Sequence, residues 1–185
     1  MPCRAACWLA LLICLGVQAV ATEPAGVWLD VPFVKQSPDG CGAASVAMVM
    51  QYWNRQQSVQ LDAHSDPDYI LQVLLSEKVH GIYASKMKQY FEANGFRAFA
   101  FQGEWPDLKQ HLDKGRPLIV ALKPSSISAT LHYVVVTGLQ AETNVVLIND
   151  PAQRKLLKQD RAGFEREWKA ARNWTLLAVP VRGDH

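Results

Sequence analysis

Cysteine is scarce in this sequence, and its placement is uneven. The chain has 185 residues and four cysteines, of which Cys3, Cys7 and Cys14 fall within the first 21 residues. Without that segment only Cys41 remains, so an internal disulfide is excluded. No pair of His or Cys residues has a ligand spacing such as Cys-x-x-Cys or His-x-x-x-His, and we therefore expect neither a metal nor a cofactor.

An excess of charge of one sign is also lacking. The 19 Lys and Arg residues nearly balance the 17 Asp and Glu residues, the formal net charge is +2, and both signs are interleaved along the chain. Binding to nucleic acid therefore has no electrostatic support. We find no repeat, low-complexity tract or internal linker, and the length favours one domain with a substantial core.

The N-terminus holds an uncharged apolar stretch. Arg4 precedes an apolar run from Ala5 to Val17, and the small residues Ala19 and Ala21 follow it. This order is typical of a secretory signal peptide. We predict a signal peptide at residues 1–21, a single domain at residues 22–185, and export to the periplasm or the cell exterior with no membrane span after cleavage. Retention of the segment as an anchor is the alternative.

Cys41 lies where a turn passes into a predicted helix. The turn contains Pro38, Asp39 and Gly40, and apolar residues at helical spacing continue from Cys41 to about Trp53. The free amides and partial positive charge of a helix N-terminus favour thiolate over thiol. A single thiol in an exported protein is a candidate reactive group, so Cys41 is the candidate nucleophile. A buried structural cysteine is the alternative reading.

Further patterns predict helices in the first half of the chain and strands in the second. Helices are expected at 67–78, after an N-cap at Asp66, and at 85–93, 105–114 and 161–171, the last capped by Asp160. Strands are expected at 97–101, 117–122, 132–137, 145–150, 155–157 and 174–181, with a hairpin loop at 138–144. This order indicates an α+β fold with an antiparallel sheet.

A histidine and an aspartate occupy matching ends of two predicted strands. His132 begins one strand and Asp150 ends the next. If the strands form a hairpin, the start of the first lies beside the end of the second. Thiol catalysis needs a base near the sulfur and a third group that orients the base. Alternatively, His132 is an ordinary strand-edge residue and Asp150 only opens an Asp-Pro turn.

Gln36 precedes Cys41 by five residues. Its side-chain amide and the Cys41 backbone N–H are expected to point at one spot, where they would stabilise the oxyanion of a tetrahedral intermediate. A surface glutamine in a loop is the alternative.

Three blocks of sequence, in this order, resemble the bacteriocin-processing, double-glycine-leader cysteine peptidases of the papain-like superfamily. The resemblance spans roughly residues 31–154. The blocks are Gln36…Cys41-Gly42-Ala43-Ala44-Ser45, Leu131-His132-Tyr133-Val134-Val135-Val136 and Ile148-Asn149-Asp150-Pro151-Ala152.

The resemblance implies a papain-like fold and a role for each candidate residue. Cys41 would be the nucleophile, His132 the general base and acid, Asp150 the group that orients His132, and Gln36 part of the oxyanion hole. Family members cut a peptide or protein substrate after a Gly-Gly leader end through a thioester acyl-enzyme. Many are fused to an ABC exporter, whereas this chain has no ATP-binding motif and carries its own export signal. Its substrate is therefore expected outside the cytoplasm, with export or surface-assembly machinery as a possible partner.

Two other functions stay open at this point. One is a papain-like amidase or acyltransferase that acts on cell-wall peptide or on another substrate that forms a thioester. The other is a catalytically silent papain-like module that binds a peptide and serves in assembly.

Overall fold

The structure is a computed structural model that describes residues 26–124, 131–140 and 142–181. The predicted signal peptide at residues 1–21 lies outside these ranges. The helices are α1 (Cys41–Gln56), a short 3-10 helix η1 (Ala63–Ser65), α2 (Pro67–Leu74), α3 (Ala84–Ala93), α4 (Trp105–Asp113) and α5 (Arg161–Ala170). Among the described ranges, no helix combines the length and apolar character that crossing a membrane requires.

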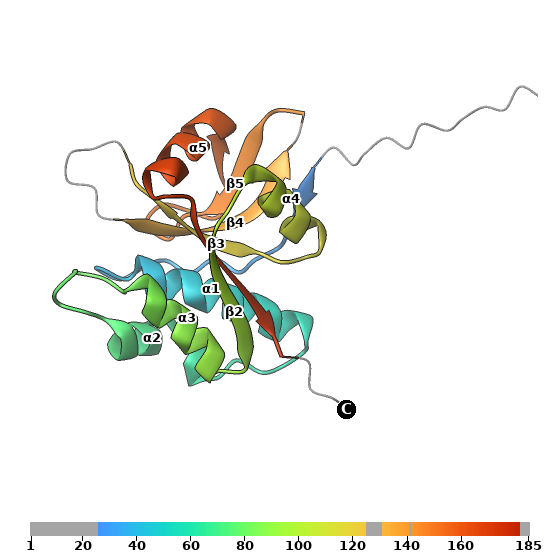
Figure 1. The fold of residues 1–185 in the computed structure, drawn as a ribbon. Coiled ribbons are helices and arrows are strands. Elements are labelled where there is room, and N and C mark those ends of the chain that lie inside the picture. Colours follow the sequence, from blue (N-terminus) through green and yellow to red (C-terminus); the bar gives the residue numbers. More distant parts are fainter. Residues whose placement is uncertain (1–25, 125–130, 141, 182–185) are drawn as a thin grey trace, which may run out of the picture.

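One antiparallel sheet holds the strands together, in the order β2-β7-β3-β4-β5-β6 (Figure 1). The strands are β1 (Val27–Trp28), β2 (Phe96–Gln102), β3 (Leu118–Leu122), β4 (His132–Gln140), β5 (Val145–Asn149), β6 (Leu157–Asp160) and β7 (Trp174–Pro180). The short strand β1 pairs with β4 outside the main order. The predicted α+β fold with an antiparallel sheet is confirmed.

The central strands bury both of their faces. Along β3, Ile119 and Ala121 belong to one hydrophobic cluster, while Leu118, Val120 and Leu122 belong to a second. Successive side chains of a strand point to opposite faces, so the two clusters lie on opposite sides of the sheet. The continuous apolar runs of the sequence follow from this burial, because each face is covered by helices.

Helices α1, α2 and α3 cover one face of the sheet, and α4 and α5 cover the other (Figure 1). Helix α1 is central, because all of its residues from Gly42 to Met50 are buried. Its predicted start at Cys41 is confirmed, and it continues three residues beyond the predicted end at Trp53. The predicted caps of two other helices are confirmed as well. Asp66 accepts hydrogen bonds from two backbone N–H groups at the start of α2, and Asp160 accepts one from Gly163 at the start of α5.

Helix α2 is shorter than predicted. It ends at Leu74 instead of continuing to about Lys78. The chain leaves the helix because Ser76 forms an isolated β-bridge with Gly81, in which the Ser76 N–H donates to the Gly81 carbonyl at 2.9 Å. The intervening turn includes His80 with a positive φ of 46°. A tertiary hydrogen bond of this kind leaves no periodic signal in the sequence.

Two strands differ from the prediction by more than one residue at an end, and the other predicted strands by one residue at most. Strand β4 continues through Gln140, so the expected hairpin loop at 138–144 begins later, and β6 covers Leu157–Asp160 rather than 155–157. Gly138, predicted in the loop, lies inside β4. A glycine is needed at this position because the backbone of β1 approaches it closely. A Cβ atom at Gly138 would lie 2.5 Å from the carbonyl oxygen of Val27. The two-residue strand β1 itself was not predicted.

Candidate active site

Cys41 is the first residue of helix α1 and a half-buried free thiol. The turn before it is closed by the Gly40 N–H, which donates to the Ser37 carbonyl at 2.9 Å. Gly40 is required there, because an added Cβ atom would lie 2.9 Å from the same carbonyl oxygen. The first backbone N–H groups of a helix have no acceptor within the helix, so those beside the sulfur are free to bind an anion.

His132 and Asp150 form a hydrogen-bonded pair. His132 Nε2 lies 2.8 Å from Asp150 Oδ1, with His132 at the start of β4 and Asp150 directly after β5. The register of the strands brings them together, since Val135 is paired with Asn149. The side chain of Asp150 is only 5% exposed and that of His132 is 22% exposed. The predicted hairpin geometry therefore joins the two residues.

The carboxylate of Asp150 is held by two further donors. The Ala152 N–H donates to Oδ1 at 2.9 Å, and the Gln153 side-chain amide donates to Oδ2 at 2.6 Å. Burial acts to raise the pKa of Asp150, but the hydrogen bond and the charge of His132, together with these donors, outweigh burial and lower the pKa. Asp150 is therefore ionised at neutral pH. The sequence reasoning missed Gln153, whose role depends on a turn that no motif marks.

His132 contacts Cys41 as well as Asp150. With Nε2 engaged by Asp150, Nδ1 is the ring nitrogen left for the sulfur. Burial is the largest single effect on the pKa of His132 and lowers it, but the hydrogen bonds to Asp150 and to Cys41 and the charges of both together raise it to about 9. An imidazole in this position keeps its proton at neutral pH when it faces a thiolate.

Gln36 lies in the same cleft as Cys41 and His132. The cleft has a volume of about 520 Å³ and is lined by Gln36, Asp39, Cys41, Val79, His80, Gly81, Ile82, Tyr83, Ala84, Leu131, His132 and Tyr133. The backbone N–H of Gln36 donates to the Pro151 carbonyl at 3.0 Å, which ties the loop before Cys41 to the turn after Asp150. Gln36 Oε1 is buried and has no hydrogen-bond partner among the described residues.

Asn149 anchors the same region from within the sheet. Its side chain is fully buried, and its amide donates to the carbonyl of Val31 at 3.1 Å. Its Oδ1 accepts a hydrogen bond from the Leu156 N–H at 3.0 Å. Asn149 thus fixes the segment that leads to Gln36 against the segment that follows Asp150.

Tyr133 and Ser45 connect helix α1 to the strand that carries His132. The Ser45 hydroxyl donates to the Tyr133 carbonyl at 3.2 Å, one helical turn after Cys41. Burial raises the pKa of Tyr133 to about 12, with a smaller contribution from the charge of Cys41. Tyr133 therefore remains a neutral phenol beside the thiol. The sequence reasoning did not single out Tyr133 for the site.

The four residues predicted for the site thus fall in one cleft or at its margin. Cys41, His132 and Gln36 line the cleft, and Asp150 lies behind His132. Within the described ranges, no group of three or more His, Cys, Asp or Glu side chains is arranged to hold a metal ion.

A cysteine at the start of a central helix, facing a histidine on an antiparallel sheet, is the arrangement of the papain-like cysteine peptidases. Residues 28–175 match the model of the Peptidase_C39 like family, and the chain belongs to this family. The resemblance derived from the sequence is confirmed, and the chain is classed with the cysteine peptidases.

Solved structures of several cysteine peptidases share the fold. A C39-like peptidase from Bacillus anthracis superposes with a TM-score of 0.63 at 20% identity, covering 85% of this chain and 99% of the other. The double glycine motif protease of an AMS/PCAT transporter, in complex with its leader peptide, has a TM-score of 0.63 at 22% identity, covering 84% and 95%. The peptidase domain of Streptococcus ComA, a bi-functional ABC transporter, has a TM-score of 0.62 at 22% identity, covering 80% and 97%. No curated protein matches the chain in sequence.

Proposed function

We propose that this protein is an exported cysteine peptidase that cleaves a peptide bond through a thioester acyl-enzyme on Cys41. The observation that carries the proposal is the continuous contact from Cys41 through the His132 ring to Asp150, with 2.8 Å between His132 Nε2 and Asp150 Oδ1. A sulfur, an imidazole and a carboxylate in this row provide a nucleophile, a proton carrier and an orienting charge.

Acylation begins with the thiolate of Cys41 and the imidazolium of His132. The sulfur attacks the carbonyl carbon of the scissile bond, and the carbonyl oxygen becomes an oxyanion. His132 then gives its proton to the departing amine, the C–N bond breaks, and the acyl group remains on Cys41 as a thioester. Asp150 stabilises the protonated ring before the transfer and keeps its orientation afterwards.

Deacylation reverses the proton movement. The neutral His132 takes a proton from a water molecule, which attacks the thioester carbonyl. The C–S bond breaks, the product leaves as a carboxylic acid, and the thiolate–imidazolium pair is restored. Both steps use the same ring, which is why its hydrogen bond to Asp150 must persist through the cycle.

The oxyanion is assigned two donors, the backbone N–H of Cys41 and the side-chain amide of Gln36. Support comes from the position of Gln36 in the cleft with Cys41 and from its backbone hydrogen bond to Pro151. This hydrogen bond holds the backbone that carries Gln36, and donors that are positioned before the reaction need little reorganisation when negative charge develops.

The proposal includes export through a signal peptide at residues 1–21 and one peptidase domain at residues 22–185. The charged, apolar and small-residue order of the first 21 residues supports it. The substrate is then an exported peptide or a protein outside the cytoplasm, handled together with export or surface-assembly machinery. A Gly-Gly cleavage site, as in the double glycine motif protease, is one candidate for the sequence that is cut.

Labelling with iodoacetamide tests the paired thiol directly. We expect rapid labelling of Cys41 in the wild-type protein at neutral pH and slow labelling in His132→Ala. Cys41→Ala measures any labelling at residues other than Cys41, and circular dichroism verifies the fold of each variant. Equal labelling rates in the wild type and in His132→Ala would contradict an activated Cys–His pair.

Peptide profiling then separates a peptidase from a binding module. Exported proteins are incubated with wild-type enzyme or with Cys41→Ala, and the peptides released are identified by mass spectrometry. We expect new peptide termini only with the wild type. Residual cleavage by Cys41→Ala within tenfold of the wild type would remove Cys41 from the mechanism.

A further inference from the structure

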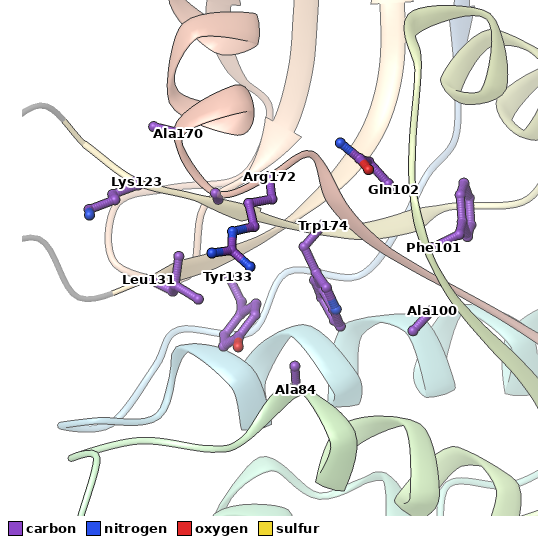
Figure 2. Close-up of a pocket in the computed structure, with 11 residues that line it drawn as sticks. Ala84, Ala100, Phe101, Gln102, Lys123, Leu131, Tyr133, Ala170, Arg172 and Trp174 are labelled. Atoms are coloured by element: carbon purple, nitrogen blue, oxygen red, sulfur yellow. The ribbon is translucent and has the colours of Figure 1, made fainter.

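A second cavity adjoins the cleft that contains Cys41. It has a volume of about 590 Å³ and shares Ala84, Leu131 and Tyr133 with the cleft as lining residues. The cavity lies where the end of helix α5 and the start of β7 pass over β4, with helix α3 on the opposite side (Figure 2). A peptide that occupies the cleft would therefore reach this cavity with a neighbouring residue.

Most of the residues that line the cavity are apolar, and several of them are small. Four alanines, Ala84, Ala100, Ala170 and Ala171, contribute only methyl groups to the lining. Tyr133 and Trp174 pack edge to face, with 5.4 Å between ring centroids, and both rings project into the space above Ala84 (Figure 2). Small residues beside two aromatic rings provide the shape and chemistry to enclose another large apolar side chain.

Arg172 supplies a positive charge at this cavity. Its side chain extends towards Leu131 and Tyr133 (Figure 2). Within the described residues Arg172 has no ion-pair partner, and none of the residues that line the cavity is acidic. A second cation, Lys123, also belongs to the lining. The cavity is therefore complementary to a ligand that carries a negative charge.

The backbone that carries Arg172 is held in an uncommon conformation. Arg172 and Asn173 have positive φ values of 57° and 51°. The junction is fixed by Gly103, whose carbonyl accepts from the Asn173 side chain at 3.0 Å and whose N–H donates to the Asn173 carbonyl at 2.9 Å. Two consecutive residues in the left-handed region are unfavourable unless the surroundings impose them, and such strain gathers at binding sites. In this protein the left-handed conformation sets the direction in which the Arg172 side chain extends from the backbone.

We propose that this cavity is a specificity subsite that takes a large apolar side chain of the substrate peptide and pairs a nearby carboxylate of that peptide with Arg172. The proposal rests on the proposed peptidase function, because it deepens that function by naming the substrate class. The residue that fills the cavity lies within a few positions of the bond that is cut, since the cavity shares three lining residues with the cleft.

A glycine at the substrate position that reaches this cavity would fill it poorly. Glycine would leave the apolar walls in contact with water, whereas an aromatic or branched side chain removes that surface from water. The Arg172 guanidinium, which has no ion-pair partner among the described residues, favours an acidic peptide over a neutral or basic one. A charge-assisted hydrogen bond to a carboxylate is stronger than one to a neutral group. Cleavage sites should therefore combine a bulky apolar residue with Asp or Glu.

Matched peptides test both parts of the proposal. Wild-type enzyme first digests a peptide library, and one preferred site is synthesised in three further versions, with the bulky residue replaced by Gly or the acidic residue by Gln or Lys. For wild type we expect kcat/KM to fall roughly fivefold or more with Gly and with Lys. The Arg172→Glu variant should prefer the Lys peptide, whereas Arg166→Glu, which changes an exposed arginine of α5 outside the cavity, should behave as wild type. Ala100→Phe should remove the preference for the bulky residue by filling the cavity.

Binding to Cys41→Ala separates failure of the subsite from failure of the peptidase. The same peptides, labelled with a fluorophore, are titrated against Cys41→Ala, which needs no turnover. Cleavage by wild type without preference among the peptides would overturn the subsite and leave the peptidase. If wild type cuts no member of the library, library peptides that combine a bulky apolar residue with Asp or Glu, and their Gly and Lys versions, are titrated instead, and preferential binding of the former would overturn the peptidase and support the subsite. Equal preferences in Arg172→Glu and wild type would remove Arg172 from recognition.

Discussion

His132 donates through Nε2 to Asp150 Oδ1 at 2.8 Å, and the carboxylate it meets is almost completely buried. Burial lowers the pKa of His132, but the hydrogen bonds and charges of Asp150 and Cys41 together raise it to about 9, so the ring stays protonated up to about that pH. The proton is the one that the departing amine needs in our mechanism. The contact with Asp150 therefore contributes to the alkaline limit of catalysis.

We expect kcat/KM to fall as the pH rises through about 9, because the His132 imidazolium is lost there. In Asp150→Asn the carboxylate charge that raises the pKa of His132 is gone, so the fall should begin at lower pH. The measurement is kcat/KM on one peptide from mildly acidic to strongly alkaline pH. An alkaline limit that is identical in both proteins would show that Asp150 does not control His132.

The same pair predicts an order among single variants. Asp150→Asn keeps a side chain that can hold the His132 ring, and papain-like relatives use Asn in this role, whereas His132→Ala removes the proton carrier itself. We expect kcat to fall further in His132→Ala than in Asp150→Asn at neutral pH. Steady-state kinetics with matched protein concentrations measures the difference. Asp150→Asn with the lower kcat would reverse the assigned roles.

Folding stability should depend on pH through His132. Its pKa is raised in the folded state, so its contribution is fully present below the unfolded value of about 6.5 and is lost as the pH rises through about 9. We expect the free energy of unfolding to decrease across this window by at most about 3 kcal/mol. Urea denaturation at a series of pH values measures it, with Cys41→Ala and His132→Ala as comparisons. A wild-type slope in this window no steeper than that of His132→Ala would contradict the prediction.

Gln36→Ala tests the oxyanion hole. Loss of one such donor lowers kcat by roughly 10²–10³-fold, because the donor acts on charge that exists only in the transition state. We expect KM to change little and the rate of Cys41 labelling by iodoacetamide to remain as in wild type. A variant with normal kcat, or one whose loss lies mainly in KM, would assign Gln36 to substrate binding instead.

The local sequence was sufficient to find the groups in the site that have strong periodic or capping signals. Cys41 follows a turn that contains Pro38, Asp39 and Gly40 and precedes an apolar helix. The proximity of His132 and Asp150 follows from the register of a hairpin. The contacts that support them depend on tertiary geometry. Gln153 reaches Asp150 only because a turn folds back, and Arg172 reaches the second cavity only through two left-handed residues at the end of α5.

The early end of helix α2 also results from a tertiary contact. The residues up to Lys78 are compatible with a helix, but the bridge between Ser76 and Gly81 competes with it and is favoured in the folded chain. That bridge also places His80 and Gly81 in the wall of the cleft. The difference from the prediction thus lies at the site, where the chain is shaped by contacts distant in sequence.

Asn149 offers a test of whether the anchored segments support catalysis. Asn149→Ala leaves the buried carbonyl of Val31 and the N–H of Leu156 without partners, and we expect it to lower the free energy of unfolding by about 2–4 kcal/mol. It should also lower kcat under conditions where the variant is fully folded, because the segment leading to Gln36 is no longer fixed. Thermal unfolding and kinetics on the same samples provide both values.

Thr137→Val is the matched control for Asn149→Ala. Thr137 is also fully buried, within β4, and its hydroxyl donates to the Leu147 carbonyl at 3.1 Å. Its link to the segment before Val31 is made by its backbone carbonyl, which accepts from the Leu29 N–H at 2.8 Å and is kept in Thr137→Val. We expect this variant to lose stability, by about 1 kcal/mol, while kcat stays at the wild-type value. If kcat falls in Thr137→Val as far as in Asn149→Ala, the effect follows from general loosening of the sheet. A fall confined to Asn149→Ala would instead mean that the sheet positions the oxyanion donor through this amide.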